Sequence, residues 1–331
     1  MSLFSAKIQN VIGPGIIFAG AAIGGSHLMS STTAGARFGF SLIVLILITN
    51  FLKYPFLLVG TRFTASTGMT LLEGFKKRNS LYLPIFLIIS LVTGTFTIAA
   101  VSFVSGVLLT NIPLFSNFPP MDLSIIVLVI CGFILIFGKY KALDNLSKIL
   151  VSLLTILTFF AVISLLINGS LNNDLTATFF NPETSPWRLS NLSFLIPLMG
   201  WMPCPVELCV WPSLWMFSKN KESKYRPTVQ EAEFDFNLGY LITIITAIFF
   251  VTLGAITMYG TGDGMLSGSG VSFAQNLIKL YTESIGEWSK WVIIPASFAA
   301  MFSTTLTCLD AYPRSISSIQ GLIKGTDLGR M

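Results

Sequence analysis

The chain is built from recurring apolar blocks, and several of them are long enough to cross a lipid bilayer. About 20 consecutive apolar residues span the hydrocarbon core of a membrane. Only 11% of the residues are charged, whereas soluble domains contain about a quarter. This pattern excludes a soluble enzyme, a nucleic-acid-binding protein and a disordered chain. It predicts an all-α integral membrane protein with eight transmembrane helices, at about 10–34, 38–60, 82–110, 122–138, 146–168, 191–217, 236–260 and 288–312.

The basic residues predict how these helices are oriented. Of the 20 Lys and Arg residues, fifteen lie on the N-terminal segment and on the connections that share its side of the membrane. Four lie on the opposite side, and Lys53 lies inside the second block, where we expect it to snorkel or to pair within its own helix. Because Lys and Arg gather on the cytoplasmic side, the N-terminus is predicted to be cytoplasmic. In a bacterium, this orientation predicts a multi-pass protein of the inner (plasma) membrane.

Two of the blocks are interrupted by helix-breaking residues. The first block contains Gly13-Pro14-Gly15 and then Gly24-Gly25, and the sixth contains Met202-Pro203 followed by Pro205. Irregular backbone at membrane depth is tolerated only where protein buries it or where it lines a cavity. Broken helices in corresponding positions of two repeats indicate a substrate site near the bilayer midplane. The alternative is that these residues only kink ordinary helices. The separation of five helices favours the transport site.

The polar and sulfur-containing residues near the two breaks are candidate ligands. His27 is the only histidine of the chain, and Met199, Met202 and Cys204 surround the second break. Neutral imidazole and sulfur groups are the softer metal ligands. We therefore expect His27 and Met202 to bind a divalent metal ion, with backbone carbonyls near Gly24 and Met199. Each of these side chains could instead pack as apolar filler.

Two further acids lie within the apolar blocks. Glu207, just beyond the sixth-block break, could balance a bound cation, relay a proton or pair with a basic residue. Asp310 precedes Arg314 at the i, i+4 spacing of a helix, which predicts a local ion pair.

Several segments together resemble the natural resistance-associated macrophage protein (Nramp) family of metal transporters. They are Gly13-Pro14-Gly15, Ala34-Gly35-Ala36, Gly138-Lys139-Tyr140 and Met202-Pro203. The resemblance implies a broken-helix, inverted-repeat fold that carries a divalent metal ion by alternating access. It places Gly24 where the family has a metal-binding Asp, His27 at the metal-binding Asn and Met202 at the thioether ligand. Cys204 replaces a family His, and the third block lacks the acids that couple metal to protons.

We expect one transporter domain over residues 1–331, with helices 1–5 at about 10–168 and helices 6–8 at about 191–312. The family fold needs at least ten helices, so we expect the C-terminal helices to be missing. No cofactor, nucleic-acid partner or enzymatic activity is predicted; the metal ion is the substrate, and the bilayer is the surrounding partner. A carrier for a small organic solute such as an amino acid is the alternative. In that case, backbone N–H groups at Gly24-Gly25-Ser26 would hold a carboxylate.

Overall fold

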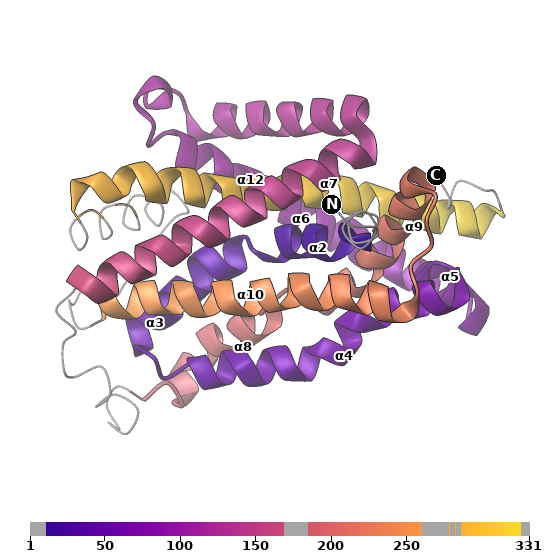
Figure 1. The fold of residues 1–331 in the computed structure, drawn as a ribbon, viewed down its shortest axis with the longest axis horizontal. Helices are drawn as coiled ribbons and strands as arrows, with labels where there is room; N and C mark the ends of the chain where they lie inside the picture. The colour runs from indigo at the N-terminus through magenta and orange to yellow at the C-terminus, as the bar shows by residue number, and fades with distance from the viewer. Residues whose placement is uncertain (1–10, 169–184, 260–277, 279–281, 283–285, 326–331) are drawn as a thin grey trace, which may run out of the picture.

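The computed structural model describes residues 11–168, 185–259, 278, 282 and 286–325, and their regular structure is helical throughout (Figure 1). The longer helices α4, α10 and α12 run across the picture in nearly the same direction. In chain order the elements are α2 (Pro14–Ala22), the π-helical turn η1 (Ser26–Ser31), α3 (Thr32–Phe38), α4 (Ile43–Thr67), α5 (Leu71–Arg78), α6 (Tyr82–Leu109), η2 (Pro113–Phe115), α7 (Pro120–Asn168), η4 (Leu189–Asn191), α8 (Leu192–Trp201), η5 (Val206–Val210), α9 (Trp211–Ser223), α10 (Val229–Met258), η6 (Glu287–Ser289) and α12 (Lys290–Lys324).

Within the described residues, six helical stretches are long and apolar enough to cross a membrane, rather than the eight separate helices predicted. The first predicted span is divided among α2, η1 and α3, each of which is shorter than a bilayer. The fourth and fifth predicted spans both lie in α7. Lys139 interrupts α7 with φ 50° and ψ −150°, and the two halves run in different directions (Figure 1).

Several helix ends differ from the predicted ends because hydropathy does not detect polar helical turns. α10 begins at Val229, seven residues before the predicted start, because Thr228 and Glu231 form a capping box. The short helix α5, which was not predicted, begins with the same arrangement of Thr70 and Glu73. Pro14 is the first residue of α2, and Ile12 and Gly13 before it are not helical, so Gly13-Pro14-Gly15 lies at the start of this helix.

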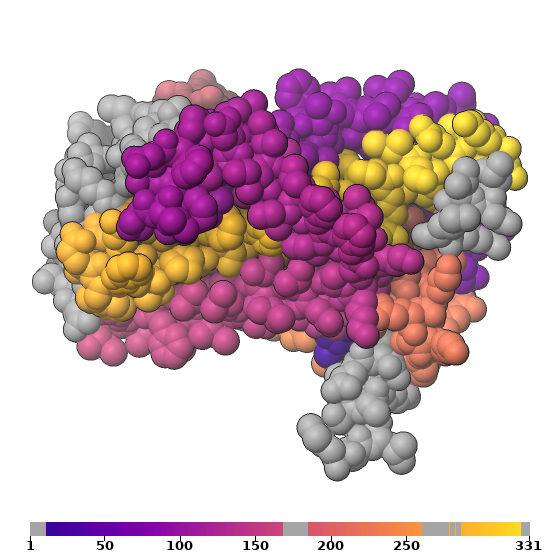
Figure 2. Space-filling model, turned by 90° about the horizontal axis from the view of Figure 1, so that it is seen from above, coloured from indigo at the N-terminus to yellow at the C-terminus, as the bar shows by residue number. Residues whose placement is uncertain are grey.

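The core of the protein lies around α12. In its most apolar window, 72% of the residues are buried inside the protein, whereas the corresponding value for α6 is 22%. Figure 2 shows α12 in yellow passing beneath the magenta α7, and α12 contacts both α6 and α7 along its length. Many large apolar side chains of α6 and α7 point outward, including Ile88 and Phe137. We infer that these side chains face lipid.

The helices α2 and α10 are in backbone contact. A Cβ atom at Gly15 would lie 2.0 Å from the Asp235 carbonyl oxygen, and one at Gly239 would lie 1.9 Å from the Gly15 carbonyl oxygen. Only glycine allows this approach. The Asp235 carboxylate accepts hydrogen bonds from the N–H groups of Gly13, at 3.0 Å, and Gly15, at 2.6 Å. α10 therefore fixes the N-terminus of the first helical segment.

Candidate functional site

The first break separates α2 from η1. Ile23, with φ −82° and ψ 78°, leaves the helical conformation, and the carbonyl oxygens of Gly20 and Ile23 lose their regular partners. The Thr304 hydroxyl of α12 lies 3.0 Å from the Gly20 oxygen and 3.2 Å from the Ile23 oxygen and donates to this pair. A Cβ atom at Gly24 would lie 2.4 Å from the Thr304 Oγ1 atom. The glycine therefore lets α12 supply the hydroxyl that satisfies the broken helix.

The second break separates α8 from η5 and α9. Met202 is extended, with φ −89° and ψ 125°, and a cis peptide bond joins it to Pro203. The Lys53 ammonium of α4 donates to the carbonyl oxygens of Met199 and Gly200, both at 2.6 Å, and to that of Cys204 at 3.2 Å. The prediction that Lys53 pairs within its own helix is therefore wrong. Its positive charge lies at the C-terminal end of α8, where the helix dipole favours a cation.

A cavity of about 420 Å³ lies between the two breaks. Its size falls within the range of small-molecule binding sites. The first break contributes Gly24, Gly25 and Ser26, and the second contributes Trp201, Pro203, Cys204, Pro205, Glu207, Leu208 and Trp211. The remaining wall comes from the C-terminal end of α2, from α6 with Phe96 and from α12 with Thr304 and Cys308.

Glu207 is the only carboxylic acid among the described residues that line this cavity, and no Lys or Arg accompanies it there. Its Oε1 atom accepts a hydrogen bond from the Tyr312 hydroxyl of α12 at 3.0 Å. The partner of Glu207 here is a neutral hydroxyl group, in place of the basic residue considered as one possibility. The cavity thus has one acidic group set among aromatic, thiol and hydroxyl groups.

The sequence was compared with known families and proteins. The model of natural resistance-associated macrophage protein-like (Nramp) proteins matches residues 15–322, which is most of the chain. The chain belongs to the Nramp family. The Nramp family consists of transporters rather than enzymes, in agreement with the sequence-based prediction. An uncharacterized protein of Pasteurella multocida is 38% identical over 314 residues, which cover 95% of this chain and 71% of that protein.

This Nramp protein also has the fold of solved manganese transporter structures. The Eremococcus coleocola manganese transporter, in complex with an aromatic bis-isothiourea substituted compound, matches with a TM-score of 0.67 and 14% identity. That match covers 97% of this chain and 66% of the transporter. A mutant of the same transporter matches with a TM-score of 0.69 at 14% identity over 100% of this chain and 68% of that one. This chain therefore spans about two thirds of the length of those transporters.

Three of the predicted ligand positions lie outside the cavity of this Nramp protein. His27 is fully buried, and its Nε2 atom lies 3.0 Å from the Thr243 carbonyl oxygen. Met202 is also fully buried, and its sulfur accepts from the Ser31 hydroxyl at 3.7 Å. The Met199 side chain is 39% exposed, and Lys53 occupies its carbonyl oxygen. Gly24, Cys204 and Glu207 line the cavity itself.

The contribution of α12 to the site was not predicted from the sequence. Thr304, Cys308 and Tyr312 are spaced four residues apart, so they lie on one face of the helix and all line the cavity. A signal was present, because residues 303–307 place four hydroxyl side chains within an otherwise apolar block. Hydroxyl groups in a membrane helix need partners, and here the Thr304 hydroxyl donates to the Gly20 carbonyl oxygen at the broken first helix.

Proposed function

We propose that this chain forms the substrate-binding part of a secondary transporter, and that the cavity between the two breaks holds a small cation. The observation that carries the proposal is the position of Glu207 on the wall of a cavity bounded by both helix interruptions. A carboxylate at membrane depth is costly unless it performs a function or finds a partner. Its negative charge would attract a cation and balance it during transport.

A divalent metal ion is the first candidate for the cargo. Family membership and the shared fold with manganese transporters support it. Within the cavity, the Cys204 thiol, the Glu207 carboxylate and backbone carbonyls at the first break would act as ligands. The protein itself needs no resident cofactor, since the metal is the substrate.

His27 and Met202 lie behind the cavity wall, so they would bind the metal ion only after a local rearrangement. A carbonyl oxygen only accepts hydrogen bonds, so in a neutral imidazole ring Nε2 carries the proton that is donated to Thr243. The Nδ1 lone pair then faces the hydroxyl of Ser26, 2.8 Å away, and Ser26 lines the cavity. Displacing this hydroxyl would expose Nδ1 to a metal ion. Met202 would join in the same rearrangement by releasing Ser31.

A small organic solute with an ammonium group, such as an amino acid, is the second candidate. Two observations favour it. Across the described residues, no group of three or more His, Cys, Asp and Glu side chains is placed to hold a metal ion. In addition, the rings of Phe96, Trp201 and Trp211 line the cavity together with Glu207. Aromatic faces and one carboxylate are the groups that recognise an organic ammonium ion.

Alternating access would move α2 and α9 about the two breaks. Both segments meet the cavity at one end, and both are joined to the rest of the protein by hydrogen bonds and ion pairs that can be exchanged. We propose that the opposite end of the molecule, with the start of α2 and the 224–228 connection after α9, faces the cytoplasm of a cell whose plasma membrane contains the protein. A cysteine placed in the 224–228 connection should then resist a membrane-impermeant thiol reagent in intact cells, and rapid labelling would reverse the proposed orientation.

Calorimetry on the purified protein would separate the two candidates. We expect Mn²⁺ to bind the wild-type protein, and Glu207→Gln to weaken binding at least tenfold. A matched control is Asp122→Asn, which changes an exposed acid in the first turn of α7. If amino acids bind and Mn²⁺ does not, the second candidate is correct. If Glu207→Gln binds either ligand as tightly as the control does, the cavity is not the substrate site.

A further inference from the structure

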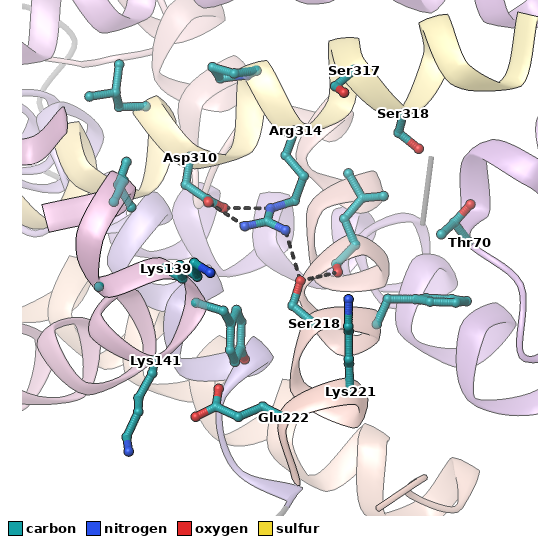
Figure 3. A pocket seen from close by; sticks show the side chains of 17 residues that line it. Thr70, Lys139, Lys141, Ser218, Lys221, Glu222, Asp310, Arg314, Ser317 and Ser318 are labelled. Carbon is teal, nitrogen blue, oxygen red and sulfur yellow. Dashed lines mark hydrogen bonds and ion pairs between the residues drawn. The ribbon is translucent and has the colours of Figure 1, made fainter. Parts of the chain in front are cut away.

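A second cavity, of about 850 Å³, lies at the opposite end of α9 from the substrate cavity (Figure 3). It is formed where the bend of α7 meets α9 and α12. The charge pattern predicts this end of the molecule to be cytoplasmic. The cavity does not share a lining residue with the substrate cavity. It therefore requires its own explanation.

One ion pair on its wall is already neutralised. Arg314 donates to both carboxylate oxygens of Asp310, at 2.9 and 2.5 Å, as the spacing of the two residues predicted. Asp310 also accepts from the indole N–H of Trp215 at 2.8 Å. The second terminal nitrogen of Arg314 donates to the Ser218 hydroxyl at 2.9 Å. Figure 3 shows the bonds of Arg314 to Asp310 and to Ser218, the second of which bridges α12 and α9.

The remaining lining charges are mainly positive. Lys139 and Lys141 come from the bend of α7 and Lys221 from α9, and Glu222 is the only acid beside them in this lining. In Figure 3, the Lys221 ammonium rises beside Ser218, whereas Lys141 points away from the cavity. Lys139 and Lys221 against Glu222 therefore leave this wall with a net charge of about +1, and Lys141 adds a further positive charge nearby. A cation leaving the substrate cavity would be repelled here, so this is not a second cation site.

The same cavity borders surface of the kind that faces lipid tails. Leu135, Phe217 and Leu309 lie among the basic residues of the lining. Immediately before the bend of α7, Ile136 is 70% exposed and Phe137 is 76% exposed. Basic groups above an apolar helix surface form an amphipathic site at the membrane boundary.

We propose that this cavity binds the headgroup phosphate of an anionic phospholipid, with the acyl chains lying along Ile136 and Phe137. Lys139 and Lys221 would supply the charges that meet the phosphate, and Glu222 would oppose it. Basic pockets between transmembrane helices on the cytoplasmic side are suited to such headgroups. A soluble anion would use the lysines but would gain nothing from the adjoining apolar surface. The proposal does not depend on the nature of the transported substrate.

The test measures binding of fluorescent phosphatidylglycerol to the full chain in neutral detergent, with phosphatidylcholine of the same chain length as the reference lipid. We expect a clear preference for phosphatidylglycerol. Lys139→Gln with Lys221→Gln should weaken its binding about 10- to 30-fold, since each lysine near an anionic headgroup contributes on the order of 1 kcal/mol. The matched control, Lys77→Gln with Arg78→Gln, removes two exposed charges at the same end of the molecule and should leave binding unchanged.

The Glu222→Gln variant tests the sign of the effect. Removing this acid should strengthen phosphatidylglycerol binding several-fold, and misfolding would not produce a gain of this kind. An unchanged preference in the double lysine variant, or a loss of binding in Glu222→Gln, would overturn the proposed site. Displacement of the lipid by inorganic phosphate at equal concentration would instead identify a site for soluble anions and overturn the assignment to lipid.

Discussion

The carboxylate of Asp235 fixes the N-terminus of α2, and its removal should measurably destabilise the protein. Asp235 is buried, with 3% of its surface exposed, and it accepts hydrogen bonds from the N–H groups of Gly13 and Gly15. These donors belong to the first turn of α2, which has no side-chain cap of its own. The carboxylate therefore satisfies the donors and also interacts with the positive end of the helix dipole.

The size of the effect can be worked out from these two bonds. A hydrogen bond to a charged group contributes about 1.5–3 kcal/mol, and a buried donor left without a partner costs a similar amount. Asp235→Ala should therefore lower the free energy of unfolding by about 3–6 kcal/mol. Asp235→Asn keeps one acceptor oxygen but places an NH₂ group near a backbone donor, so we expect about half of that loss. Asp122→Ala, an exposed first-turn acid, should cost less than about 1 kcal/mol.

Reversible unfolding in mixed detergent and SDS micelles, followed by tryptophan fluorescence, would give these free energies. The expected order of stability is wild type, then Asp235→Asn, then Asp235→Ala, with Asp122→Ala close to wild type. If Asp235→Ala and Asp122→Ala have the same small effect, the two N–H groups find other partners. The close packing of α2 against α10, rather than the carboxylate, would then hold this end of the first segment.

Three further predictions concern the two breaks. Gly24→Ala should destabilise the protein by about 1–3 kcal/mol, because the new methyl group would lie 2.4 Å from Thr304 Oγ1. Adding Thr304→Ala should recover part of this loss. If it recovers nothing, the clash lies elsewhere. Lys53→Met should lower the free energy of unfolding by about 2 kcal/mol or more, because three carbonyl oxygens lose a charged donor. Lys53→Arg, which keeps the charge, should lower it by less. Equal losses in the two variants would show that the charge is unimportant. His27→Ala should weaken Mn²⁺ binding at least tenfold in calorimetry, provided that the variant elutes and unfolds like a folded protein; normal binding would exclude His27 from the site and favour the organic solute.

The sequence by itself determined the class of the protein. Long apolar blocks with few charges require membrane helices, because in lipid each backbone N–H and C=O group must be satisfied within its own segment. The Gly24-Gly25 and Met202-Pro203 interruptions correctly marked the places where two helices break. The motifs around them identified the Nramp family, which the family comparison confirmed. Local chemistry fixes all of these features, so they can be read without knowledge of the packing.

Hydropathy alone was less informative about where helices begin and end. The first turn of α10 after the N-cap Thr228 is mostly polar, with Val229 as a single apolar residue, so a hydropathy window does not detect it. The capping boxes that start α5 and α10 are local sequence signals, and they would have indicated α5 and corrected the start of α10. The bend of α7 at Lys139 falls between the spans predicted at about 122–138 and 146–168, but its backbone conformation was not predicted, because a residue at φ 50° is held there by the surrounding structure.

Only the tertiary structure decided which side chains meet in the cavity. Side-chain direction follows a fixed period within a regular helix, but this period is lost where the backbone unwinds, so the sequence did not determine where His27 and Met202 point. In the fold both are buried behind the cavity wall, while Thr304 and Tyr312 complete the site from α12, and Thr304 lies 284 residues beyond its partner Gly20. The partners of Lys53 could not be predicted from the sequence either, because they are carbonyl oxygens about 150 residues away. These oxygens become available only because α8 ends at Trp201. These contacts depend on how the broken helices pack against intact ones, and that is a property of the whole fold.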